Sequence, residues 1–220
     1  MTTLLIIDVA LETAFVILVK DTIVLDVKIN KVQQTHASWL HIAIEQLCNT
    51  NNVALHTLQA IAVTNGPGSY TGLRIGMSAA KGLCYALQIP LITLDNLKLI
   101  ALANNTPSNC LYIPMIDARR DEVYCCTFNT NFEIITTHSA VILNADSFEH
   151  ELAKQQVIFC GDGAAKFSII CTHTNAIFSA IMYTQIELVQ LALQQFNTLA
   201  FANLTYAEPN YIKPFYIAKK

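Results

Sequence analysis

Residues 65–82 read NGPGSYTGLRIGMSAAKG and hold five of the chain's seven glycines. The segment follows the apolar run Ile61–Val63, so it has the form of a strand, a glycine-rich turn and a helix. Glycine inside a helix is less favourable than alanine by about 1 kcal/mol. Gly72, Gly76 and Gly82 therefore indicate that a ligand or a neighbouring helix approaches this helix closely.

A phosphate is the first candidate for that close approach. A glycine-rich turn entering a helix presents free N–H groups to an anion. The spacing does not fit the familiar forms, because neither Gly66 nor Gly68 is followed by the Gly-Lys-Ser/Thr of a P-loop. Gly72 also comes one residue late for the dinucleotide fingerprint GxGxxG. The sequence thus disfavours a phosphate loop of either type.

Helix packing is the second candidate. Gly72, Gly76 and Ala80 lie four residues apart on one helical face, with Ala79 and Leu83 beside them. A stripe of small residues lets another helix come unusually close. The stripe is either a docking surface for a partner or a helix crossing within the same lobe.

Apolar periodicity predicts two lobes that share one order of elements, and the polar stretch 104–109 marks their boundary. For the first lobe, residues 1–107, we expect strands at 4–7, 13–19, 23–29, 58–64 and 90–94, and helices at 35–48, 71–87 and 96–103. For the second lobe, residues 108–220, we expect strands at 111–116, 122–128, 133–137 and 157–160, and helices at 147–155 and 187–201. Strands joined through a helix should be parallel, which gives an α/β fold.

Composition narrows the class of protein. Only 13% of the residues are charged while 53% are hydrophobic, so we expect part of the apolar surface to face a partner. The net charge of −3 and only three arginines argue against tight nucleic-acid binding by this chain alone.

The sequence also indicates the cellular compartment of the protein. Seven cysteines without CxxC spacing indicate buried thiols in a reducing compartment. The most apolar stretch, residues 4–27, is interrupted by charges, and no signal peptide precedes it. We expect a cytoplasmic protein with no membrane contact.

Two polar turns are further candidates for a site. A charge cluster at a hairpin turn is either a solvated turn or a surface facing the cleft between the lobes; its members are Asp117, Arg119, Arg120, Asp121 and Glu122. The turn Gly161-Asp162-Gly163 follows an apolar strand, an arrangement common in nucleotide-binding clefts and elsewhere. His36 and His41 are five residues apart, so they cannot share a metal on a helix.

The glycine segment also carries a family resemblance. Its extended form, GPGSYTGLRIGMSAAKGLCYALQIPLI, resembles the hallmark segment of the bacterial tRNA threonylcarbamoyladenosine biosynthesis protein family TsaB (YeaZ), an actin-like, glycoprotease-like family. Other segments agree in order and extend the similarity over nearly the whole chain: IIDVALETAFVIL, THASWLHIAIEQL, IDARRDEVY, FCGDGA and AEPNYIKP. The resemblance implies an actin-like fold of two similar lobes, each with a mixed sheet flanked by helices.

The resemblance implies a function in a complex. Members of the family are non-catalytic partners of a paralogue, TsaD, which transfers a threonylcarbamoyl group to an adenosine beside the tRNA anticodon, and an ATPase, TsaE, joins them. Without the paralogue they form homodimers through the same helices. The paralogue holds its metal through a HxxxH pair, which this sequence lacks. We therefore expect no catalytic residue and no metal ligand here, only indirect contact with tRNA, and ATP or ADP only at an interface shared with the partner.

The resemblance also suggests site residues. The partner-binding helices 35–48 and 71–87 would contribute Trp39, Leu40, Ala43, Leu47, Gly72, Gly76, Ala79, Ala80 and Leu83. Candidate nucleotide contacts are Asp8, Gly66, Ser69, Thr71, Gly161, Asp162 and Gly163. The family's first turn carries a hydroxyl after the aspartate, whereas Val9 and Ala10 follow Asp8 here.

Two other functions stay open at this point. Asp8 in the first turn and the Gly161-Asp162-Gly163 turn would serve an ATPase or phosphotransferase of the same fold. A metallopeptidase is the other alternative, although the sequence has no HExxH motif.

Overall fold

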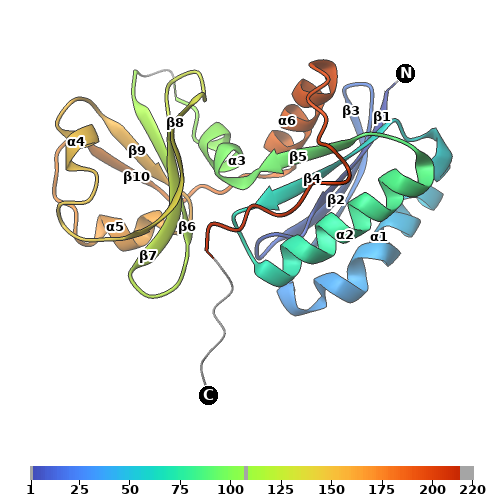
Figure 1. Ribbon diagram of the computed structural model, residues 1–220, viewed down its shortest axis with the longest axis horizontal. Coiled ribbons are helices and arrows are strands. Elements are labelled where there is room, and N and C mark those ends of the chain that lie inside the picture. The colour runs from blue at the N-terminus through green and yellow to red at the C-terminus, as the bar shows by residue number, and fades with distance from the viewer. Residues whose placement is uncertain (1, 107–108, 214–220) are drawn as a thin grey trace. The chain divides into compact units, whose positions relative to one another are not determined.

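The computed structural model describes residues 2–106 and 109–213 (Figure 1). The chain forms two compact units. Among the described residues, the first unit comprises 2–96 and 184–210, and the second comprises 97–106, 109–183 and 211–213. The predicted lobe boundary, between residues 107 and 108, lies outside the described residues.

The first unit is built on a mixed five-stranded sheet of order β3-β2-β1-β4-β5. Its β1, β2 and β3 form an antiparallel meander, and β4 and β5 extend the sheet in parallel from β1. The strands are β1 (Thr3–Asp8), β2 (Ala14–Lys20), β3 (Ile23–Asn30), β4 (Ala60–Gly66) and β5 (Leu91–Asp95). The predicted strands of the first lobe and their parallel strand–helix–strand unit are confirmed.

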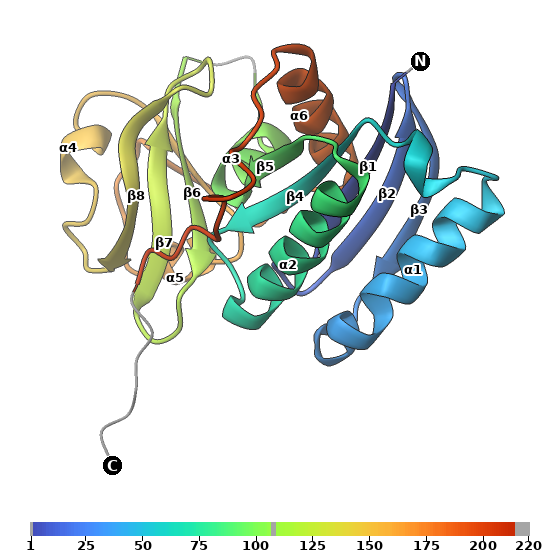
Figure 2. The same cartoon turned by 45° about the vertical axis from the view of Figure 1, so that its right-hand side comes forward.

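Helices cover both faces of this sheet. Figures 1 and 2 show α1 (His36–Thr50) and α2 (Tyr70–Leu87) side by side on one face and α6 (Gln185–Asn197) on the other. The 3₁₀ turns η1 (Gln33–Thr35) and η2 (Leu55–Thr57) flank α1. One core cluster joins the inner faces of α1 and α2 to the sheet, as their apolar periodicity predicts.

The second unit repeats the connectivity of the first. Its sheet has the order β10-β9-β6-β7-β8, with the same antiparallel and parallel pairings. The strands are β6 (Leu111–Asp117), β7 (Glu122–Phe128), β8 (Ile134–Ile142), β9 (Val157–Cys160) and β10 (Ala176–Ser179). Helices α4 (Glu149–Leu152) and α5 (Ala164–Ser168) lie on one face and α3 (Asn96–Ala103) on the other (Figure 1). The shared order of elements predicted from the sequence is therefore a duplicated topology.

The two helices that follow the sheets exchange places. α6 follows the second sheet in the chain but belongs to the first unit, where it packs against β1, β2 and β5. α3 follows the first sheet, and from Leu97 onward it belongs to the second unit. The predicted lobes, 1–107 and 108–220, divide the chain at a single point. The observed units differ from them because α3 and α6 are exchanged.

The helix predicted at 187–201 is α6, which begins at Gln185 and ends at Asn197. Further differences from the predicted elements are in the second unit. The helix predicted at 147–155 is reduced to the four residues of α4, and the strand predicted at 133–137 extends to Ile142. The short α5 and β10 have no predicted counterpart. No helix in the described part of the chain has both the length and the apolar character needed to cross a membrane.

The cysteines contribute to the cores as thiols. All seven carry a thiol and not a disulfide, and all but Cys171 are buried. Burial raises the pKa of the Cys84 and Cys125 thiols to about 11. Because the thiolate is the reactive form, these side chains should behave as small apolar groups, as the sequence predicted.

We predict that a maleimide modifies only Cys171 in the folded chain at neutral pH. The other thiols are shielded by burial, and a raised pKa reduces the thiolate fraction of four of them further, namely Cys48, Cys84, Cys125 and Cys160. Intact-mass and peptide mass spectrometry should find a single slow modification that is absent from Cys171→Ser. Rapid labelling of Cys84 or Cys125 would contradict the burial of these two thiols.

Candidate functional site

The turn after β1 is the first predicted site. The Asp8 side chain is fully buried, and its Oδ1 accepts hydrogen bonds from the Ala10 N–H at 3.0 Å and the Thr64 hydroxyl at 2.7 Å. These bonds fix the β1–β2 turn and link it to β4. Asp8 thus occupies a structural position, and Val9 and Ala10 beside it are also buried.

The glycine-rich turn joins β4 to α2. The Ser69 N–H donates to the Ala10 carbonyl at 2.7 Å, and the Ser69 side chain accepts from the Gly72 N–H at 3.3 Å as the N-cap of α2. Gly66 at the end of β4 has a φ of +109° and donates its N–H to the Asn96 side chain. Three predicted nucleotide contacts, Gly66, Ser69 and Asp8, therefore serve the local structure.

The glycines of α2 are explained by the β1–β2 turn. A Cβ at Gly72 would lie 2.0 Å from the carbonyl oxygen of Val9, and one at Gly68 would lie 2.7 Å from that of Ala10. A Cβ at Gly76 would lie 3.0 Å from a methyl group of Val9. The part of the protein that approaches this helix is therefore the chain's own first turn.

This packing corrects the docking stripe proposed from the sequence. Gly72, Gly76 and Ala80 are buried against the first unit's own sheet and turn. On α1, the side chains of Leu40, Ala43 and Leu47 also belong to the core. These six residues are unavailable to another chain, because the period of an amphipathic helix marks its core face as readily as a binding face.

The outer side of α1 and α2 carries exposed apolar side chains and an exposed glycine. On α1, Ile42 is 54% exposed, and on α2, Tyr85 is 72% exposed. A Cβ at Gly82 would meet nothing within 4 Å, so this glycine is bare toward solvent. Of the remaining predicted contacts, Trp39 and Leu83 are partly buried and pack against the core, and Ala79 is a buried member of it. We call the surface around Ile42, Ser78, Gly82 and Tyr85 the outer helix face.

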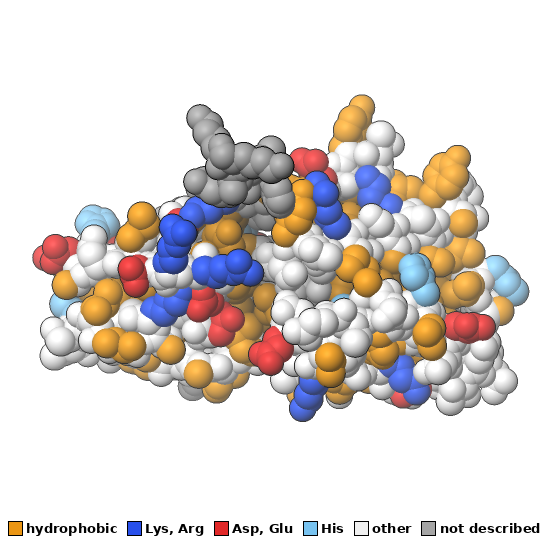
Figure 3. Space-filling model, turned by 90° about the horizontal axis from the view of Figure 1, so that it is seen from below, with side chains coloured by type: hydrophobic (Ala, Val, Ile, Leu, Met, Phe, Trp, Pro, Cys, Tyr) orange, Lys and Arg blue, Asp and Glu red, His pale blue; other side chains and the backbone are white. Residues whose placement is uncertain are grey.

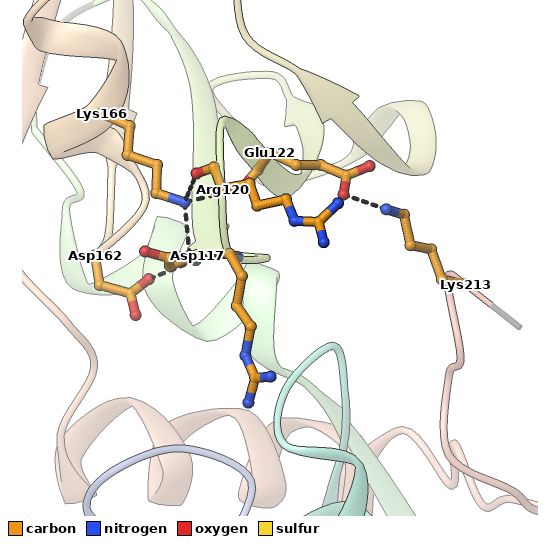
Figure 4. Close-up of polar contacts among 7 residues, drawn as sticks. Asp117, Arg120, Glu122, Asp162, Lys166 and Lys213 are labelled. Carbon is orange, nitrogen blue, oxygen red and sulfur yellow. Dashed lines mark hydrogen bonds and ion pairs between the residues drawn. The ribbon is translucent and has the colours of Figure 1, made fainter. Parts of the chain in front are cut away.

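The charge cluster at the β6–β7 turn is an ordered network within the second unit (Figure 4). The Lys166 ammonium donates to Asp117 Oδ1 at 2.7 Å and to the Arg120 carbonyl at 2.5 Å. Asp117 also accepts from the Arg119 N–H at 2.6 Å, and Lys213 pairs with Glu122. The turn, which the sequence predicts as either solvated or facing the cleft between the lobes, is thus tied to α5 by Lys166.

This network lowers the pKa of Asp117. Burial alone would raise the pKa of Asp117, but hydrogen bonds from Lys166 and from the Arg119 N–H outweigh it and lower the pKa below its ordinary value of 3.8. Figure 3 shows Lys and Arg side chains gathered beside acidic ones at the left of the view. Arg119 and Arg120 both have positive φ angles, 68° and 51°, and both are exposed.

The Gly161-Asp162-Gly163 turn is packed against β6. A Cβ at Gly161 would lie 2.5 Å from the Met115 carbonyl oxygen, and Gly163 is similarly enclosed. Asp162 accepts the Asp117 N–H at 3.0 Å, and partial burial together with the nearby Asp117 raises the pKa of Asp162. Close packing therefore explains both glycines without a nucleotide.

Metal ligands and unsatisfied polar groups are the remaining features of a possible site. In the described ranges, 2–106 and 109–213, no three His, Cys, Asp or Glu side chains are grouped so that they could hold a metal ion. Within the same described residues, two buried side chains have ring or amide atoms without a hydrogen-bond partner, namely both nitrogens of His36 and Oδ1 of Asn65. No sequence pattern marked His36 as unusual; only its surroundings do.

Two sheets of identical connectivity, each mixed and flanked by helices, define an actin-like two-lobe α/β fold. A crystallised Pseudomonas aeruginosa protein described as similar to peptidase YeaZ shares this fold, with a TM-score of 0.82 at 24% identity, over 97% of this chain and 100% of the other. YeaZ from Pseudomonas aeruginosa superposes with a TM-score of 0.75 at 25% identity, over 96% of this chain and 100% of the other.

The chain belongs to the TsaD family, tRNA N6-adenosine threonylcarbamoyltransferase, whose family model matches residues 28–217. Among curated relatives, the tRNA threonylcarbamoyladenosine biosynthesis protein TsaB of Bacillus subtilis is 36% identical over 122 residues, which is 56% of this chain and 53% of the relative. The match thus spans about half of that relative's length. The resemblance to TsaB proteins predicted from the sequence is confirmed.

We predict opposite effects for two alanine substitutions in α2. Gly72→Ala should destabilise the first unit by about 3 kcal/mol or more, because the new Cβ overlaps the Val9 carbonyl. Gly82→Ala should stabilise it by about 1 kcal/mol, because the site is open and alanine favours the helix. Urea denaturation followed by circular dichroism measures both. Equal midpoints for the two variants would contradict the packing of the turn on α2.

We predict that Lys166→Met raises the pKa of Asp117 and destabilises the second unit near neutral pH. Asp117 has a lowered pKa in the folded state, so its ion pair contributes stability above pH 3.8 and loses it as the pH falls through the folded pKa. The stability difference from the wild type should therefore shrink below about pH 3.8.

Carboxyl ¹³C titration and thermal melts between acidic and neutral pH provide the measurements. Lys154→Met is the matched control, because the Lys154 ammonium contacts His150 and not the turn. An unchanged Asp117 titration in Lys166→Met would show that the pair does not control the carboxyl.

Proposed function

We propose that this chain is a non-catalytic subunit in the formation of threonylcarbamoyladenosine in tRNA. In this proposal it binds its catalytic paralogue, TsaD, through the outer helix face, and the ATPase TsaE joins the complex. The TsaB relatives and the family match support the pathway. The mode of action is supported by one observation: the outer helix face exposes Ile42, Tyr85 and Gly82, and nothing in the first unit covers them.

The outer helix face has the properties of a helix-packing interface. Ile42 and Tyr85 expose large apolar surfaces that the first unit leaves uncovered. Gly82 has no side chain and Ser78 has a small one, so a partner helix could approach the α2 backbone closely. The same surface would also serve homodimers when the paralogue is absent, so the two assemblies should compete.

Catalysis is assigned to the partner. Asp8, the residue on which an ATPase or phosphotransferase would depend, is buried with its Oδ1 engaged by Thr64 and Ala10. The sequence offers no HxxxH pair for a metal. We therefore propose that the chain acts by holding the paralogue in its active geometry, and that any ATP or ADP binds where the partner completes the site.

We predict that Gly82→Leu weakens binding to TsaD at least tenfold and reduces tRNA modification in a reconstituted system. The leucine side chain has room in the isolated chain, so the fold should be retained, but it would hold a partner helix away. Co-purification and titration calorimetry measure binding, and nucleoside mass spectrometry measures the modification.

Gln190→Leu is the matched control, because it adds a leucine at an exposed position of α6, on the opposite face of the first sheet. It should bind like the wild type. Undiminished TsaD binding by Gly82→Leu would reject the outer helix face, and modification that proceeds equally without this chain would reject the proposed function. Turnover of ATP with magnesium by the isolated chain would favour an enzyme.

A further inference from the structure

A small cavity lies between the N-terminal ends of α1 and α2. It has a volume of about 220 Å³ and lies within the first unit. Its polar lining comprises Gln33 and Gln34 from η1, His36 from the start of α1, and Ser69 and Thr71 from the start of α2, while Ile75 forms part of an apolar wall. The predicted nucleotide contacts Ser69 and Thr71 thus meet here, without the other residues grouped with them.

His36 gives the cavity its unusual chemistry. The residue is only 2% exposed, and neither Nδ1 nor Nε2 has a hydrogen-bond partner. An imidazole always carries at least one N–H donor, and a buried donor without an acceptor costs free energy. Native proteins rarely leave such a group unsatisfied, so its persistence calls for a physical reason.

The start of α2 adds further donors. The Thr71 N–H lies in the first turn of an 18-residue helix, where no carbonyl of the preceding turn is available to it. The N-terminal end of the helix dipole favours negative charge at this point. Among the residues that line the cavity there is no Asp or Glu to supply that charge.

We propose that this cavity binds an oxyanion, a phosphate or a carboxylate group. The anion's oxygens would accept hydrogen bonds from the His36 ring and the Thr71 N–H and hydroxyl, with the Gln33 and Gln34 amides at the rim. This chemistry supplies the acceptor that the buried imidazole lacks. The inference does not depend on the proposed function, because every residue that carries it belongs to the first unit of this chain.

The test uses the full-length chain and two probes, inorganic phosphate and acetate, with sodium chloride to match the ionic strength. Long-range ¹H–¹⁵N spectra report on the His36 ring, and amide spectra report on Thr71 and Gly72. Saturable shifts confined to these groups are expected with at least one probe. Tighter binding of phosphate would identify a phosphoryl ligand, and tighter binding of acetate a carboxylate.

Two variants locate the binding. His36→Leu should weaken binding at least tenfold while the fold is retained, because it replaces an unpartnered polar ring by an apolar side chain. His41→Leu is the matched control on the exposed side of the same helix and should bind like the wild type. Thr71→Val, at an exposed position, should also weaken binding and provides a second test if His36→Leu is unstable.

The proposal is overturned by either of two results. The first is that neither phosphate nor acetate shifts the wild-type signals beyond the chloride control. The second is that His36→Leu and Thr71→Val bind the anion as tightly as His41→Leu.

Discussion

The packing of the β1–β2 turn into the glycines of α2 fixes the arrangement of the first unit. Val9 and Ala10 lie so close to Gly68 and Gly72 that a single methyl group would collide with a carbonyl oxygen. Asp8 holds the turn in place through Ala10 and Thr64, so the contact joins β1, β4 and α2. With its inner face committed in this way, α2 turns Ser78, Gly82 and Tyr85 outward and sets its first turn beside the start of α1.

This contact also shows what the sequence could and could not determine. The glycine spacing correctly required a close approach to one face of α2, and it excluded the two familiar phosphate loops. It could not identify what approaches, because a helix of the same lobe, a partner and a turn of the chain itself all favour small residues. Gly82 looked like part of the same pattern, yet it lies on the opposite, open side of the helix.

The elements themselves followed the strength of their periodic signal. Long amphipathic segments such as α2 and the apolar runs of β1 to β3 were predicted within a few residues. The short α5 and β10 were not: five residues of α5 make little more than one helical turn, and β10 is only partly buried, unlike the equally short but fully buried β9. The exchange of α3 and α6 was also out of reach, since the sheet that a terminal helix covers depends on tertiary packing rather than on sequence order.

Val9 and Ala10 also bear on where ligand chemistry could reside. The family resemblance leads one to expect a hydroxyl after Asp8, where an actin-like fold would place phosphate contacts. Here both residues are only 1% exposed, and a methyl group of Val9 packs beside Gly76. The turn therefore contributes apolar packing where a phosphate-binding turn would need a polar group. The His36 ring, buried without a hydrogen-bond partner, lies instead at the start of α1, so the anion site that we propose is beside His36 and not at the end of β1.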